Sequence, residues 1–199
     1  MPGPERPADK PSEDLDSSCQ RAGKRRLCRQ GVELISEQFE RRNGVDHVIM
    51  DSPVGRLFIG QEAGAIVYLT TKAPPEGKEG DSALLREAAG QLQEYFEGER
   101  TEFTLPLAPR GTLFQKAVWA ALCKVPYGQT VSYGQLAALA GRPKAARAVG
   151  SAMAQNPIAV IQPCHRVLPA SGGLGYYSMG GPANKEWLLL LERQNRLSF

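Results

Sequence analysis

The strongest constraint on the fold is a change in the spacing of apolar residues, from a strand pattern to a helical one. Residues 47–71, HVIMDSPVGRLFIGQEAGAIVYLTT, form three short apolar runs separated by DSPVG and QEAG. Turn sequences between apolar runs predict an antiparallel meander. APPEGKEGD is expected to be an exposed loop, and a helix should follow from Asp81 or Ser82. Its apolar stripe comprises Leu85, Ala88, Ala89, Leu92 and Phe96. Residues 45–109 therefore predict a small α/β domain, and no polar cluster in it indicates a site.

From residue 110 onward the pattern is helical. Thr112 with Gln115, and Ser132 with Gln135, have the spacing of capping boxes that open helices. Gly141 is expected to end the second helix, and KAARAVGSAMAQN forms a third before Pro157. Two short helices joined by a tight turn are typical of a helix-turn-helix. Residues 110–199 thus predict a second, helical domain.

Residues 1–44 differ from both domains. The opening MPGPERPADKPSEDLDSSCQ is rich in Pro, Ser and mixed charge, which predicts a disordered tail. A basic cluster within the tail could be a nuclear import signal, an extra phosphate contact or a solvated segment without a role. It consists of Arg21, Lys24, Arg25, Arg26 and Arg29. Residues 31–41 have weak helical spacing.

Composition excludes several classes of protein. No stretch approaches the roughly 20 apolar residues of a membrane span, and the first 30 residues have no signal-peptide pattern, so an intracellular protein is expected. The four cysteines are widely spaced, which favours reduced thiols over a disulfide framework.

Charge is strongly segregated along the chain. Residues 110–199 hold 10 Lys/Arg and 2 Asp/Glu, residues 45–109 hold 5 and 11, and residues 1–44 hold 9 and 8, giving +8, −6 and +1. A basic segment almost without carboxylates can approach a polyanion such as nucleic acid. An electrostatic match between the acidic and basic segments of one protein explains the charges equally well.

The third predicted helix of the second domain carries little side-chain bulk. It presents Lys144, Ala145, Ala146, Arg147, Ala148, Gly150, Ser151 and Ala152. Such a helix can bring its backbone close to a DNA groove or to a neighbouring helix. The Asn, Gln and multiple Arg side chains that read the major groove are mostly missing. If it binds DNA, we expect backbone and minor-groove contacts with Arg147 inserted into the stack or groove.

A cysteine directly precedes a histidine in IQPCHRVLPASGGLG, residues 161–175. Adjacent Cys and His do not have the spacing of a zinc site, so Cys164 is either a functional or a buried structural thiol. His165 and the following glycines favour a functional thiol, because a thiolate needs stabilisation and a ligand needs close approach. Consecutive side chains in an extended segment point to opposite faces, so a water or a tight turn would have to connect the two residues. After residue 110 the only carboxylates are Glu186 and Glu192, and Glu192 projects beside the apolar stripe of the last helix.

These motifs resemble the O6-alkylguanine-DNA alkyltransferases, also called methylated-DNA–protein-cysteine methyltransferases. The resemblance rests on PCHRV, on TVSYGQLAALAGRPKAARAVGSAMAQNP, on GYYS and on KEWLLLLE, with a weaker match at DSPVGRLFI. It implies an α/β plus α fold, with a ribonuclease-H-like domain before a winged helix-turn-helix-like domain. It also implies that the protein binds duplex DNA in the minor groove, flips out the damaged base and transfers its alkyl group to a cysteine once. O6-Alkylguanine, and less readily O4-alkylthymine, would be the substrates.

The resemblance also assigns residues by motif. Cys164 would accept the alkyl group, His165 would take its proton through a water, Glu192 would orient the histidine, and Tyr133 would act on guanine N3. Arg147 would fill the gap left by the flipped base, with Lys144, Ala145, Ala146, Ser151 and Tyr133 also at the DNA. The substrate pocket would comprise Met153, Asn156, Val167, Tyr177 and Ser178.

Some positions depart from the family pattern. Ala159, Gln162 and Met179 leave the preferred lesion size open. Some animal relatives bind structural zinc, but the corresponding stretch here has Asn43, Glu62 and Val67, so no metal and no cofactor are expected. The partner should be alkylated double-stranded DNA, in the nucleus, with the protein a monomer. A non-catalytic module that binds alkylated DNA is the main alternative. A papain-type hydrolase would need a distant histidine, and only His47 is available.

Overall fold

A computed structural model describes residues 44–73 and 78–195. The predicted disordered tail, its basic cluster and the weak helix at 31–41 lie outside these residues. The described residues belong to one compact unit, Asn43–Phe199. Within the described part of the chain, no helix is long and apolar enough to cross a membrane.

The first domain contains the predicted meander. β1 (Asp46–Met50), β2 (Leu57–Glu62) and β3 (Ala65–Thr70) pair antiparallel, with β2 between β1 and β3. The tight turn between β1 and β2 is closed by Ser52 and Gly55, and Gly55 has a φ of 106° that favours glycine. The exposed loop predicted at 73–81 is in part wrong, because Lys78–Glu79 form a short strand, β4, parallel to β1. Lys78 N and the following Gly80 N donate to the carbonyls of Val45 and His47, so this segment covers the edge of β1.

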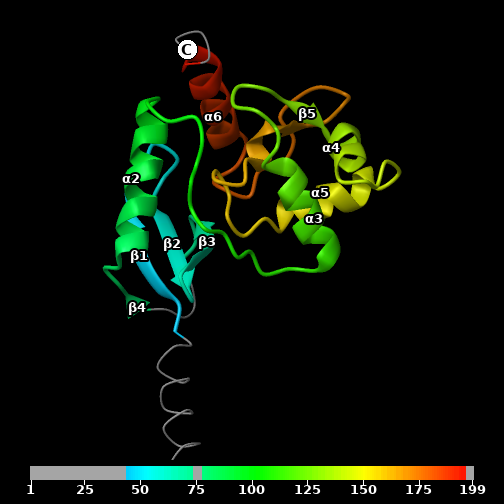
Figure 1. Ribbon diagram of the computed structural model, residues 1–199. Coiled ribbons are helices and arrows are strands. Elements are labelled where there is room, and N and C mark those ends of the chain that lie inside the picture. The colour runs from blue at the N-terminus through cyan, green and yellow to red at the C-terminus, as the bar shows by residue number, and fades with distance from the viewer. Residues whose placement is uncertain (1–43, 74–77, 196–199) are drawn as a thin grey trace, which may run out of the picture. The chain divides into compact units, whose positions relative to one another are not determined.

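Helix α2 (Ala83–Glu97) packs along the sheet (Figure 1). Ser82 caps its first turn by accepting a hydrogen bond from Leu85 N, and Gly98 ends it with a φ of 82°. The buried face differs slightly from the predicted stripe. Tyr95 is fully buried, whereas Phe96 is only partly buried. The buried face of α2 therefore places the hydroxyl of Tyr95 in the protein interior.

The second domain contains the helices that the capping signals predict. They are α3 (Leu113–Leu122), α4 (Tyr133–Leu139), α5 (Ala146–Ala154) and α6 (Pro182–Asn195), with a short 3-10 helix, η1 (Cys164–Arg166). Both predicted capping boxes, at Thr112 and Ser132, are present with both hydrogen bonds. α5 begins later than expected, because residues 142–145 form a turn in which Ala145 N bonds to the carbonyl of Arg142. α3, α4 and α5 pack together.

Two short strands connect the cysteine segment to the start of α4. β5 (Val131–Ser132) pairs parallel with β6 (Val167–Leu168). This pairing places the end of η1 beside the N-terminus of the helix that begins with Tyr133. Neither strand was predicted, since two residues carry no periodicity.

The outer edge of β3 is covered by segments from later in the chain. Ile66 N donates to the carbonyl of Pro106 at 2.8 Å, and Ala108 N donates back to Ile66. Leu69 N donates to the carbonyl of Pro157 at 2.8 Å. The sheet is thus joined by backbone hydrogen bonds both to the end of the first domain and to the segment that leads to Cys164.

Candidate active site

The segment that carries Cys164 is buried throughout. All residues from 158 to 167 are buried, and Asn156 holds both ends of the preceding turn. Its side-chain amide donates to the carbonyl of Gln162 at 2.8 Å, and its oxygen accepts from Ile158 N at 3.1 Å. Val160 has a φ of 71°, which is strained for a β-branched residue. A strained residue persists only where its surroundings fix it, so the segment is held firmly from both sides.

Cys164 lies at the start of η1 and is 5% exposed. A narrow opening of about 40 Å³ reaches it. Four residues that the sequence assigned to the site line this opening together with Ala154 and Tyr176: Tyr133, Met153, Tyr177 and Ser178. The structure therefore brings the thiol and most of the predicted pocket residues together.

Asn156 and Val167 are also at the site. Asn156 forms a hydrogen bond to Cys164 that favours the thiolate. The carbonyl of Val167 accepts a hydrogen bond from Lys185 Nζ at 2.7 Å, and the carbonyl of Cys164 accepts one from Val167 N. Because a carbonyl oxygen has two lone pairs, each can accept one further donor.

His165 contacts Glu192, as the helical projection predicted. His165 Nε2 lies 2.7 Å from Glu192 Oε1, and both side chains are fully buried. Burial lowers the pKa of His165, against the opposing effect of Glu192, so the imidazole is neutral near pH 7. A neutral imidazole beside a carboxylate donates through Nε2. Its buried Nδ1 has no hydrogen-bond partner among the described residues and is the basic nitrogen.

Glu192 is held as a carboxylate. Burial alone would raise its pKa, but hydrogen bonds and charge from His165 and Arg166 outweigh burial and lower the pKa to about 2. Arg166 donates through Nε and Nη2 to the two carboxylate oxygens at 2.9 to 3.1 Å, and Gly128 N donates to Oε2 at 2.9 Å. Glu186, the other candidate carboxylate, is exposed.

Sequence reasoning missed three residues of this site. Arg166 is part of the PCHRV motif, and a buried arginine needs a carboxylate partner. Residues 110–199 contain only two carboxylates, so the partner could have been narrowed to Glu186 or Glu192. Lys185 lies on the same face of α6 as Leu188 and Glu192, at i, i+3 and i+7, so its burial was also predictable. Tyr95 comes from the first domain, where no site was expected. No sequence signal connects it to a cysteine 69 residues away.

Lys185 and Cys164 influence one another. Burial raises the pKa of the Cys164 thiol, and the hydrogen bond from Asn156 and the charge of Lys185 oppose this rise. Burial likewise lowers the pKa of Lys185, while Cys164 opposes that change. Near pH 7 the resting pair is a thiol next to a neutral histidine, with a cation close enough to favour the thiolate once it forms.

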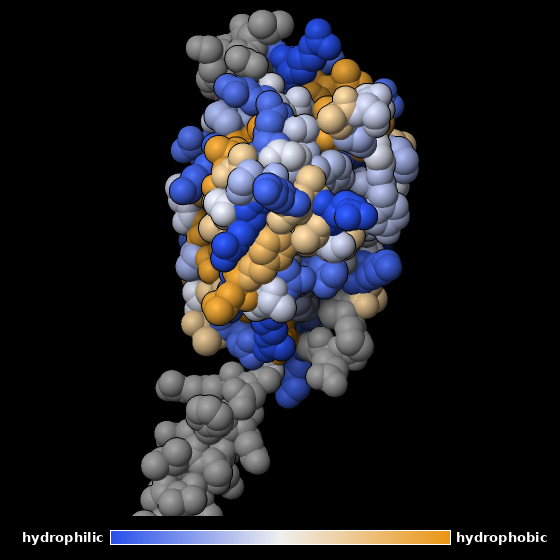
Figure 2. All heavy atoms as spheres, turned by 90° about the vertical axis from the view of Figure 1, so that its right-hand side faces the viewer, coloured by the Kyte–Doolittle hydropathy of each residue, from blue (hydrophilic) through white to orange (hydrophobic). Residues whose placement is uncertain are grey.

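The predicted DNA-contacting residues lie along α4 and α5. Arg147 and Ser151 are exposed on α5, Lys144 is exposed just before it, and Ala145 and Ala146 are partly buried. A Cβ added at Gly150 would be 4.0 Å from the Tyr133 ring, so α5 passes close to the pocket. Figure 2 looks from the side on which α4 and α5 lie in Figure 1, and hydrophilic and apolar surface are mixed there.

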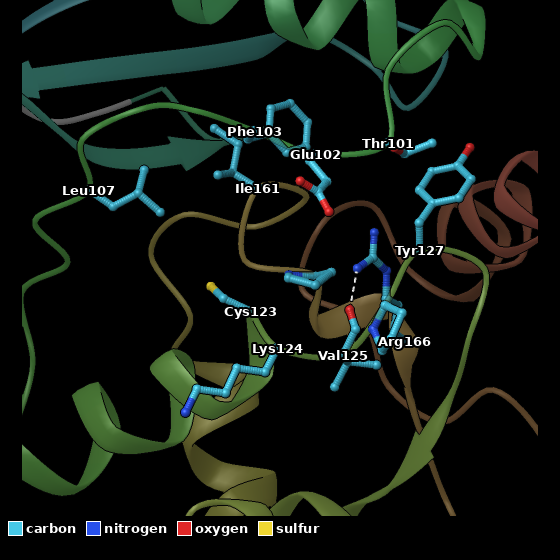
Figure 3. A pocket seen from close by; sticks show the side chains of 12 residues that line it. Thr101, Glu102, Phe103, Leu107, Cys123, Lys124, Val125, Tyr127, Ile161 and Arg166 are labelled. Carbon is cyan, nitrogen blue, oxygen red and sulfur yellow. Dashed lines mark hydrogen bonds between the residues drawn. The ribbon is translucent and has the colours of Figure 1, made fainter.

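A larger hollow, of about 480 Å³, lies elsewhere and does not include Cys164. Residues 101–103, near the end of the first domain, face residues 123–125 across it (Figure 3). Arg166 lines its wall and donates to the carbonyl of Val125 at 2.6 Å. Cys123 is exposed at this hollow.

The zinc prediction concerns other positions. Glu62 forms an ion pair with Arg110, and Val67 is buried, while Asn43 lies outside the described residues. Within residues 44–73 and 78–195, no cluster of three or more His, Cys, Asp or Glu side chains is arranged to hold a metal ion.

The fold and site define a class of protein with a sheet domain, a helical domain and a buried cysteine beside a His–Glu pair. Comparison with protein families agrees with this description. The 6-O-methylguanine DNA methyltransferase ribonuclease-like domain matches residues 47–109, and the DNA-binding domain of the same proteins matches residues 113–194.

Individual relatives show the same likeness. The methylated-DNA–protein-cysteine methyltransferase of Methanosarcina acetivorans is 43% identical over 73% of this chain and 97% of its own length. That of Mycobacterium leprae is 45% identical over 75% of this chain and 93% of its own length. A crystal structure of Mycobacterium tuberculosis OGT in complex with DNA is 44% identical, has a TM-score of 0.71, and is matched over 76% of this chain and 94% of that one. The chain belongs to the methylated-DNA–protein-cysteine methyltransferase family, and the α/β plus α fold expected from its motifs is confirmed.

Proposed function

We propose that this protein repairs DNA by transferring the alkyl group of O6-alkylguanine in duplex DNA to Cys164 Sγ. The observation that carries the proposal is the buried Cys164 beside the His165–Glu192 pair, in an opening lined by Tyr133 and Tyr177. The names of the relatives, and the DNA complex of one of them, support a DNA substrate. O4-Alkylthymine would be a poorer substrate of the same reaction.

The proposed reaction is a single nucleophilic displacement. The Cys164 thiol loses its proton through a water to Nδ1 of His165, and Glu192 stabilises the imidazolium that results. Sγ then attacks the alkyl carbon, so that an S–C bond forms as the O6–C bond breaks. Burial, followed by the nearby Cys164, raises the pKa of Tyr133, so its hydroxyl stays protonated and can donate to N3 of the departing guanine.

The product is a thioether, which has no hydrolytic exit. Each molecule therefore reacts once.

Access to the thiol requires the target base to leave the duplex. The opening of about 40 Å³ is far smaller than the roughly 300–1,000 Å³ of typical ligand sites, so its walls must move to admit a purine. The 172–175 segment contains three glycines with positive φ and leads directly into Tyr176 and Tyr177, which line the opening. We propose that this segment opens, that the flipped base enters, and that Arg147 occupies its place in the stack. Lys144 and Ser151 would contact the backbone, and Ala145 and Ala146 would allow close approach in the minor groove.

Intact-protein mass spectrometry after incubation with a duplex containing O6-methylguanine tests the reaction. We expect one methyl mass increment, mapped to Cys164 and missing in Cys164→Ala. Binding without any mass increment would instead support the alternative of a non-catalytic module. Loss of methylguanine with recovery of unmodified protein would mean hydrolysis and would refute the proposal.

A separate experiment tests the role of Arg147. Arg147→Ala should slow repair of a duplex lesion far more than reaction with the free base, because the free base needs no flipping. Lys116→Ala, an exposed cation on α3, is the matched control. Equal loss on both substrates would contradict a role in flipping.

The monomeric state and the nuclear location stay predictions. The relatives reported above come from an archaeon and from bacteria, whose cells have no nucleus, so they lend the location no support. The basic cluster behind that prediction lies outside the described residues. Analytical ultracentrifugation and fluorescence imaging of the tagged full chain would test them.

A further inference from the structure

The hydroxyl of Tyr95 reaches the His165–Glu192 pair from the other domain. Tyr95 is on α2, is fully buried, and donates to Glu192 Oε1 at 2.7 Å. The same oxygen accepts from His165 Nε2, also at 2.7 Å. The two donors, Tyr95 Oη and His165 Nε2, lie 3.4 Å apart.

The direction of each hydrogen bond follows from protonation. Glu192 is ionised and can only accept, and burial, followed by the charge of Glu192, keeps the pKa of Tyr95 well above its usual value. Tyr95 and His165 therefore both donate to Oε1. Both donors converge on an oxygen that Arg166 also contacts, which explains the 3.4 Å between Tyr95 Oη and His165 Nε2 without a hydrogen bond joining them.

A buried tyrosine hydroxyl usually has a hydrogen-bond partner. A hydrogen bond from Tyr95 to any acceptor would therefore be explained by burial alone. What distinguishes Tyr95 is which acceptor it has. It donates to the same oxygen that accepts the hydrogen bond from His165 Nε2, so it limits rotation of the carboxylate and withdraws part of its negative charge. Both effects act on the histidine rather than on the packing of α2.

We propose that Tyr95 is a positioning residue for the reaction at Cys164. Its hydroxyl fixes Glu192 so that His165 carries its proton on Nε2 and presents an unprotonated Nδ1. This inference rests on the proposed alkyl transfer for its kinetic consequence, but its effect on the histidine can be measured without DNA.

The expected pH effect depends on every charged or titratable group around His165. These are Tyr95 from α2, Cys164 and Arg166 from η1, Lys185 and Glu192 from α6, and Tyr127 and Tyr177 from the adjoining loops. Removing the Tyr95 hydroxyl leaves the others in place and strengthens the attraction between Glu192 and an imidazolium. The pKa of His165 should then rise. Because the neutral imidazole is the base, the acid limb of the alkylation rate should move to higher pH.

Tyr95→Phe tests this because it retains the ring and removes only the hydroxyl. We expect the acid limb to move up by about one pH unit, given the usual strength of a hydrogen bond to a charged group. We expect the rate at neutral pH to fall by about tenfold, a part of what general acid–base catalysis contributes. Tyr68→Phe is the matched control, since the Tyr68 hydroxyl in β3 has no partner among the described residues. It should leave both the rate and the pH profile unchanged.

Nitrogen-15 NMR of histidine gives the second readout. The chain has only two histidines, so His47→Gln assigns the signals. Wild-type protein should show the Nε2–H tautomer of His165, and Tyr95→Phe should raise its pKa by about one unit. Replacing Tyr95 with 3-fluorotyrosine, a stronger donor, should lower the pKa instead.

These measurements separate the two proposals. If the NMR shifts appear but no methyl group reaches Cys164, the positioning role stands and the proposed function fails. A folded Tyr95→Phe with unchanged His165 pKa and tautomer overturns the positioning role, and so does a slower reaction whose pH profile is unmoved.

Discussion

The buried negative charge of Glu192 is compensated by hydrogen-bond donors that surround its two carboxylate oxygens. Arg166 supplies a permanent positive charge, and Gly128 N, His165 and Tyr95 complete the shell. Removing one member of such a buried pair leaves the other charge without compensation. The stability of the site and its chemistry therefore depend on the same residue.

Glu192→Gln should lower the free energy of unfolding by about 3 kcal/mol, because Arg166 stays buried without its carboxylate. Urea denaturation at pH 7 measures the change. Glu186→Gln, exposed on the same helix, is the control and should cost less than about 0.5 kcal/mol. Equal effects from the two substitutions would contradict the prediction.

The lowered pKa of Glu192 predicts that the folded protein loses stability at acidic pH. The pKa of Glu192 is lower in the folded protein, about 2, than in the unfolded chain, about 4.3. Its contribution is therefore complete above pH 4.3 and is lost as the pH falls toward 2, about 3 kcal/mol in all. Denaturation curves between pH 6 and 2 should show this loss in the wild type and a smaller one in Glu192→Gln. Parallel curves would refute the assignment.

Lys185→Met should raise the pKa of the Cys164 thiol, because the cation that favours the thiolate is lost. The rate of reaction with iodoacetamide should then reach half its maximum at higher pH. Lys116→Met is the exposed control. Thermal unfolding of both variants shows whether loss of the bond to the Val167 carbonyl also weakens the fold, and an unmoved pH profile in a folded variant would count against the role of Lys185.

At the scale of elements, the sequence predicted those features that depend on residues close together in the chain. The capping boxes at Thr112 and Ser132 appear as expected because their hydrogen bonds span only three residues. β4, β5 and β6 have two residues each and exist only through their partners, so no periodicity could reveal them. In the site, Cys164, His165 and Glu192 were predictable from spacing and helical projection. Tyr95 was not, because only tertiary packing brings α2 to α6.

Two helix glycines should respond in opposite directions to alanine. Gly150 lies inside α5 with only ordinary contact to Tyr133, so Gly150→Ala should stabilise by about 0.5–1 kcal/mol. Gly98 ends α2 with a φ of 82°, and an added Cβ would clash with the Asn195 amide, so Gly98→Ala should destabilise by more than about 1 kcal/mol. Thermal unfolding of both variants measures this, and shifts of the same sign would be inconsistent with the structure.

At the scale of the whole molecule, the segregated charge has a physical consequence. The basic residues of the second domain are not neutralised locally, since that domain contains only two carboxylates and one of them is buried against Arg166. Attraction to a polyanion is therefore expected, and the match of residues 113–194 to a DNA-binding domain favours DNA as that polyanion. The acidic first domain would remain away from the phosphates.

DNA affinity should fall steeply with salt, because each phosphate contact releases a condensed counterion. Lys144→Ala should reduce the slope of log K against log salt by about 1. Fluorescence anisotropy with duplex DNA at several salt concentrations measures the slope. Arg56→Ala, an exposed cation of the first domain, should leave it unchanged. Equal slopes for wild type and Lys144→Ala would exclude a phosphate contact by that side chain.

The covered edge of β3 bears on how the molecule opens. Since Leu69 N donates to the carbonyl of Pro157 in the second domain, the two domains cannot separate without breaking this hydrogen bond at the edge of the sheet. The amide proton of Leu69 should therefore exchange with solvent only when the contact between the two domains is lost, which hydrogen exchange measures. If the 172–175 segment opens as proposed, a base could enter without loosening the loop that holds Cys164, because that loop is fixed by Asn156 and is buried from 158 to 167.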